Sequence, residues 1–161
     1  MKKLFMVLAV ALGFTVAASA QPRAIGGRLY GGPEISYQHT VHNADFIELD
    51  AGLNWFGDLG FKATCNYNFM VAQPRWTNRG EWGVYVGPGL SLGNLGRHSV
   101  LFTVNCQVGL EYTFWFPLQL SFDLRPEFGL YAGGHDGESW CKYHLDGLFG
   151  FIPTLSVRYR F

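Results

Sequence analysis

The C-terminal segment Pro153-Thr154-Leu155-Ser156-Val157-Arg158-Tyr159-Arg160-Phe161 decides the fold of this chain. Successive side chains of a β-strand point to opposite faces, so every second residue shares a face. On this spacing one face is apolar throughout, and the other carries the polar residues Thr154, Ser156, Arg158 and Arg160. The segment therefore predicts a strand with one apolar and one polar face, which stops at an aromatic residue.

A strand that ends in this way resembles the terminal strand of bacterial outer-membrane β-barrels. In those proteins the aromatic end acts as the assembly signal. The resemblance implies that Phe161, Tyr159 and Val157 form this signal here. It also implies two partners, the barrel-assembly machinery and the lipid of a Gram-negative outer membrane.

The first twenty residues are typical of a secretory signal peptide. Met1-Lys2-Lys3 is a short basic start, residues 4–16 are mostly apolar, and Ala18-Ser19-Ala20 is a small-x-small cleavage site. The alternative is an anchoring helix, but the apolar run is shorter than the ~20 residues that span a bilayer. We therefore expect a signal peptide at 1–20, cleaved near Ala20, and a barrel domain at 21–161 in the outer membrane.

Composition agrees with a barrel and excludes some partners. Aromatic residues make up 17% of the chain, and 21 of the 161 residues are glycine. Loss of Lys2 and Lys3 with the signal peptide lowers Lys+Arg from 12 to 10 against 12 acidic residues, which gives no reason to expect nucleic acid as a partner. The length of the domain allows about eight membrane-spanning strands of ~9–11 residues.

Alternating runs separated by polar or glycine-rich breaks predict the strands. Seven are clear, at 25–38, 47–55, 61–71, 81–92, 100–113, 118–130 and from near Leu148 to the end. Single-chain bacterial barrels have an even number of strands, so we expect an eighth, either within 21–29 or before Leu145. The fold class is thus an all-β transmembrane antiparallel β-barrel. The segment 133–144 is interpreted as the longest polar loop, on the extracellular side.

Alternation alone does not decide which face is inside, because soluble lipocalin-type barrels alternate with their apolar face inward. Two features favour an apolar exterior: aromatic residues near the strand ends, and polar faces that mix both signs of charge. We therefore predict an interior charge network made of Arg28, Glu34, Glu48, Asp50, Lys62, Glu111, Asp123, Arg125, Glu127, Arg158 and Arg160.

Prolines and cysteines raise two further expectations. Pro33, Pro88, Pro126 and Pro153 fall within the predicted strands, where each removes a hydrogen-bond donor, and we expect bulges or kinks there. The alternation places Cys65 and Cys106 on apolar faces, as small apolar residues, and Cys141 in a loop.

Further segments resemble small outer-membrane β-barrel proteins of the porin-like family. They are Gly109-Leu110-Glu111-Tyr112-Thr113-Phe114, residues 117–128, residues 85–89 and residues 34–38. The resemblance implies fold and location; it carries no catalytic motif.

Three classes of function follow from these observations. The first is a non-enzymatic barrel with a packed polar interior, which presents surface loops or supports envelope integrity; its surface ligand is not specified by the sequence. The second is a small-solute pore, suggested by the many glycines on the polar faces. The third is a lipid-modifying enzyme built on His98-Ser99 or on His135, Asp136 and His144, of which the last three are also a conceivable metal site. We expect the first, with no catalytic, cofactor-binding or metal-binding residue.

Overall fold

The computed structural model describes residues 21–161 except 55–58, 95, 97–98, 136–137 and 147–152. The signal peptide predicted at 1–20 lies outside the described residues. The described chain is built of strands: β1 Pro22–Leu29, β2 Pro33–His42, β3 Asp45–Asn54, β4 Gly60–Ala72, β5 Glu81–Gly93, β6 Ser99–Thr113, β7 Leu118–Leu124, β8 Glu127–His135, β9 Glu138–Asp146 and β10 Pro153–Arg160.

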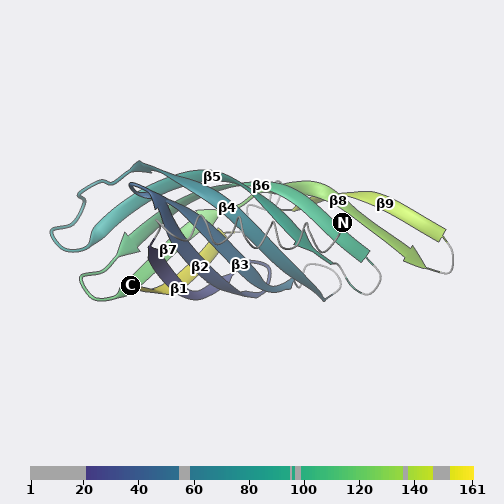
Figure 1. The fold of residues 1–161 in the computed structure, drawn as a ribbon, viewed down its shortest axis with the longest axis horizontal. Coiled ribbons are helices and arrows are strands. Elements are labelled where there is room, and N and C mark those ends of the chain that lie inside the picture. The colour runs from purple at the N-terminus through teal and green to yellow at the C-terminus, as the bar shows by residue number, and fades with distance from the viewer. Residues whose placement is uncertain (1–20, 55–58, 95, 97–98, 136–137, 147–152) are drawn as a thin grey trace.

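These segments form a closed antiparallel barrel of eight strands, as the sequence predicts (Figure 1). Neighbours follow the chain from β1 to β6, and β7 and β10 close the circle back to β1. β7 and β8 are two parts of one strand, because both pair with β6 in one continuous register. β9 pairs with β8 and β10 pairs with β7, so β9 and β10 together run along the whole of that strand.

The two ends of the barrel differ. Ala24 pairs with Arg160, so β1 begins and β10 finishes at one end, which we call the termini end. That end also carries the segment 73–80 and the turn 114–117. The β8–β9 hairpin lies at the opposite end and extends beyond the other strands (Figure 1).

The eighth strand lies within one of the two regions proposed for it. Residues 25–38, predicted as a single strand, are instead the end of β1, a turn at 30–32 and the start of β2. Leu29 pairs with Pro33 across this turn, so both point to the same side. Since residues four apart also share a face in an uninterrupted strand, the period-two pattern continues through the turn and hides it. Gly31 provides the left-handed conformation of the turn, with φ of 57°.

One further boundary was predicted wrongly. The segment 133–144 is not a loop but most of the β8–β9 hairpin, and Cys141 therefore lies in a strand. Among the described residues the final strand begins at Pro153; the predicted start near Leu148 lies outside the described residues.

The prolines interrupt the ladder in different ways. Pro33 begins β2, so the prediction that it lies mid-strand is wrong. Pro153 is the first described residue of β10, and the residues before it lie outside the described part of the chain. Pro126 follows Arg125 in the break between β7 and β8. Pro88 is inside β5, and no pairing links residues 87–88 to 67–68 of β4, although the register on both sides of this gap is the same. A missing N–H thus opens the ladder locally without displacing the strands.

The barrel has a polar inside and an apolar outside. Ile35, Val100 and Leu155 are 58–68% exposed, whereas the neighbouring polar positions of the same strands are buried. Cys65 and Cys106 lie on the exposed, apolar face, and all three cysteines are free. In the described residues, no helix is long and apolar enough to cross a membrane.

Candidate functional site: the barrel interior and its mouth at the termini end

Charged side chains fill the barrel where a soluble domain has an apolar core. Among the residues whose burial is described, eleven are buried, five basic and six acidic, which leaves a net charge of −1 among them (5 − 6). Ten of the eleven residues named from the sequence belong to this set; Arg160 is only half-buried, and Arg23 is the additional member. The buried residues are Arg23, Arg28, Glu34, Glu48, Asp50, Lys62, Glu111, Asp123, Arg125, Glu127 and Arg158.

Arg28 of β1 joins carboxylates from three other strands. Its guanidinium donates hydrogen bonds to Glu48 of β3 and to Asp123 of β7. It also lies 3.6 Å from Glu34 of β2 and 3.5 Å from Asp50 of β3. An arginine offers five donors in a planar fork, so one side chain satisfies several carboxylates. Arg28 therefore fixes β1, β3 and β7 relative to one another.

Arg125 spans the barrel from the break between β7 and β8. It donates hydrogen bonds to Asp50 on β3 at 2.7 Å and to Glu34 on β2 at 3.3 Å. Its Nε is 3.4 Å from Glu127. In the eight-stranded circle, β3 is directly opposite the β7–β8 strand. This salt bridge therefore crosses the middle of the interior and obstructs it.

Glu48 is the acidic centre of a second cluster. Arg158 of β10 approaches it to 3.0 Å, and Gln38 and Gln107 donate to it at 2.7 Å and 3.1 Å. Arg158 also donates to Ser36 at 2.9 Å. Contacts from β1, β2, β6 and β10 thus converge on one carboxylate of β3, because short polar residues leave room for the long ones.

Ion pairs also lie toward the two ends of the interior. Lys62 donates to Glu127 at 3.0 Å, and Arg23 donates to Glu111. Arg23 precedes the strand predicted from Ile25, and alternation continued from Ile25 would turn it outward. A register shift between Pro22 and Ala24 directs Arg23 inward instead, and no feature of the sequence predicts this bulge.

Two tyrosines pack among the charges. The ring of Tyr30 lies between the Lys62 ammonium, 4.2 Å from its centroid, and the Arg125 guanidinium, 4.5 Å from it. Tyr85 donates to Asp123 at 3.2 Å. A Cβ at Gly109 would collide with the Tyr85 ring, so this glycine provides the space for the tyrosine.

Along the middle of β4 and β6, between Lys62 near one end and Glu111 near the other, the interior is lined by amides. Asn66, Asn68 and Asn105 are buried, and each has at least one side-chain polar atom without a hydrogen-bond partner: Asn66 Oδ1, Asn68 Oδ1 and Nδ2, and Asn105 Oδ1. A buried amide group left without a partner costs about 1–3 kcal/mol. This sector therefore favours internal water as the missing partner.

The predicted assembly-signal residues lie on the outer face at the termini end. Val157, Tyr159 and Phe161 are 55–66% exposed, and the rings of Tyr159 and Phe161 are 5.6 Å apart. The backbone N–H of Phe161 donates to the carbonyl of Arg23 at 3.1 Å, so the end of β10 is bonded to the beginning of β1.

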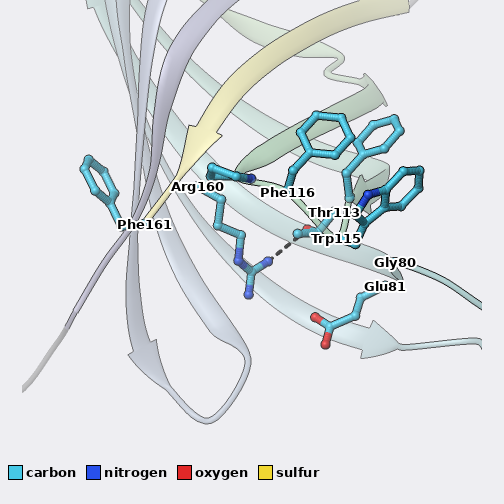
Figure 2. Close-up of a pocket in the computed structure, with 9 residues that line it drawn as sticks. Gly80, Glu81, Thr113, Trp115, Phe116, Arg160 and Phe161 are labelled. Atoms are coloured by element: carbon cyan, nitrogen blue, oxygen red, sulfur yellow. Dashed lines mark hydrogen bonds between the residues drawn. The ribbon is translucent and has the colours of Figure 1, made fainter.

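A pocket of about 550 Å³ opens at the mouth of the barrel at the termini end (Figure 2). Arg160 and Glu81 lie on one side of it, and the turn with Trp115 and Phe116 lies on another (Figure 2). Arg160, predicted within the charge network, forms no ion pair in the described part of the chain and donates instead to Thr113 Oγ1 at 2.9 Å. The sequence does not reveal this pocket, because its walls come from three separate segments.

The structure describes only some of the residues that the sequence offered for catalysis or metal binding. His98 and Asp136 lie outside the described residues, and Ser99 is buried at the start of β6. Within the described part of the chain, no three His, Cys, Asp or Glu residues are grouped as a metal site requires.

Comparison with known proteins gave no match to any family model, to any curated protein or to any solved structure.

Proposed function

We propose that the mature chain is a non-enzymatic barrel of the bacterial outer membrane, held in lipid by its apolar exterior and made rigid by its ion-paired interior. The observation that carries the proposal is the inverted distribution of polarity. An exterior that remains 58–68% exposed at Ile35, Val100 and Leu155 is unfavourable in water but suits hydrocarbon. Strands β4, β5 and β6, of 13 to 15 residues, exceed the ~9–11 residues that cross a bilayer.

The direction of insertion follows from the two ends. A signal peptide delivers the chain from inside the cell, so the termini end faces the periplasm and the β8–β9 hairpin faces the exterior. The hairpin exposes Trp140, Tyr143 and Leu145 at 38–77%. The proposed role is to present this hairpin and the neighbouring loops while the barrel supports the envelope.

The decisive experiment is fractionation of cells followed by electrophoresis of unheated and boiled protein. Folded membrane barrels resist the detergent and migrate differently until they are boiled, so we expect an outer-membrane species with this shift. Deletion of Phe161 should lower the amount of inserted protein and leave export across the inner membrane intact. A secreted product that needs no detergent would overturn the proposal.

A small-solute pore is the second candidate. The amide-lined sector beside β4–β6, with its unpartnered Asn66, Asn68 and Asn105 atoms, favours a hydrated path. The salt bridges of Arg125 across the middle of the barrel oppose it. Conductance of the purified protein in planar bilayers separates the two candidates. Discrete channel openings would establish a pore, and the absence of channel current at every voltage would exclude one.

A further inference from the structure

The pocket at the termini end carries two opposite charges that do not neutralise each other. Arg160 and Glu81 both line it, and no salt bridge joins them. Arg160 is held by Thr113 through one of its guanidinium nitrogens, which leaves its other donors available. The side chain of Glu81 makes no hydrogen bond or ion pair within the described residues.

Local geometry fixes the backbone positions from which the two charged side chains extend. Arg160 and Thr113 are at the ends of β10 and β6, in the barrel wall. Glu81 begins β5, directly after Gly80, whose φ of 74° is a conformation that other residues rarely adopt. A Cβ at Gly80 would also meet the hydroxyl of Tyr112, so the approach of this segment requires glycine.

Aromatic rings form the facing wall. Phe114, Trp115 and Phe116 contact one another, with ring centroids 5.0–5.9 Å apart. Trp115 is 65% exposed and Phe116 is 44% exposed, so both have surface to offer a ligand. Pro117 completes this wall and stiffens the turn. The volume of about 550 Å³ lies within the ~300–1,000 Å³ of small-molecule sites.

We propose that this pocket binds a small zwitterion of the α-amino-acid class with an apolar or aromatic side chain. Its carboxylate accepts hydrogen bonds from Arg160, and its ammonium group donates to Glu81. The side chain packs against Trp115 and Phe116. A zwitterion complements Arg160 and Glu81 at the same time. An anion would be repelled by Glu81, and a cation would be repelled by Arg160. The site is distinct from the ion-paired interior and goes beyond an anchoring role.

The test uses the refolded mature chain in a non-ionic detergent and three related probes. Ligand-observed saturation-transfer NMR titrations compare L-phenylalanine with phenylalanine amide, which lacks the carboxylate, and with phenylpropionate, which lacks the ammonium group. We expect L-phenylalanine to bind ~10-fold or more tightly than either analogue, the scale of one charge-assisted hydrogen bond. No binding of L-phenylalanine, or equal binding of the three probes, would overturn the proposal.

Substitutions test which group of the ligand each charged side chain binds. Glu81→Gln should weaken L-phenylalanine binding and leave phenylpropionate binding unchanged or stronger. Arg160→Gln should weaken L-phenylalanine and spare the amide. Lys142→Gln is the matched control, because Lys142 is exposed in β9 at the opposite end of the barrel and lines no part of this pocket. A heat-dependent gel shift verifies that each variant is folded. Equal losses in the control and the two pocket variants would indicate a general charge effect and refute the assignment.

Discussion

β9 and β10 pair with successive parts of the same long strand, yet their surroundings differ. β10 has two neighbours, β7 and β1, and its residues alternate between buried and exposed. β9 has one neighbour among the described residues, β8, and residues 140–143 are all exposed. Both are regular strands with continuous pairing. Hydrogen bonding therefore does not create the polarity pattern of β10; the contrast between an enclosed interior and an outer surface does.

The difference between the two strands predicts where substitutions are costly. In β10 and the rest of the barrel wall, each face has a defined environment, and a change of polarity conflicts with it. In β9, side chains on both faces are exposed, so a change of polarity there disturbs few contacts.

The largest effect is expected from removal of a buried cation in the wall. Arg158→Met takes from Glu48 a partner at 3.0 Å and leaves Ser36 and Ser121 without their donor. Removal of one partner of a buried pair costs ~3–5 kcal/mol. Urea titration in detergent, followed by the gel shift, measures the free energy of unfolding. Lys142→Met, the same change in β9, should alter it by less than ~0.5 kcal/mol. Equal losses would show that the hairpin is as constrained as the wall.

A charge on the outer face of the wall should cost somewhat less. Val104 is 45% exposed in the middle of β6, and Val104→Arg is expected to lower the free energy of unfolding in lipid vesicles by ~2–4 kcal/mol if the residue faces hydrocarbon. Val104→Ala is the control, because it reduces size without adding charge. A fully stable Val104→Arg protein would contradict the proposed membrane location.

A third prediction compares the two faces of the wall through glycine. Gly109→Ala introduces a Cβ that meets the Tyr85 ring and Asp123, and overpacking of this kind costs ~1–3 kcal/mol. Gly27 faces outward with nothing within 4 Å of an added Cβ, so Gly27→Ala should be neutral or slightly stabilising. Similar effects at both sites, measured by the same urea titration, would show that the interior is looser than its contacts indicate.

The same reasoning explains what the sequence predicts and what it does not. Wherever a strand separates two environments, alternation identifies it, and the interior charges from Arg28 to Arg158 follow from their positions on the polar faces. Alternation does not reveal β9, because Trp140 and Lys142 lie on one side of it and Cys141 and Tyr143 on the other, without separation by polarity. It does not reveal the turn at 30–32 either, because the pattern continues through it. The inward direction of Arg23 depends on a bulge, and the pocket depends on three segments that only the closed barrel brings together.

The smallest effect, and the sharpest test of the comparison, is expected from Tyr143→Arg in β9. Tyr143 is 77% exposed and belongs to a strand that extends past the barrel rim, so an added charge there remains in water (Figure 1). We expect the free energy of unfolding in lipid vesicles to change by less than ~0.5 kcal/mol, against the ~2–4 kcal/mol expected for Val104→Arg. If Tyr143→Arg lowered the free energy of unfolding by as much as Val104→Arg, hydrocarbon would reach the outer face of the hairpin. The membrane would then extend beyond the barrel wall along β8 and β9, and the hairpin would serve as part of the anchor rather than as a presented surface.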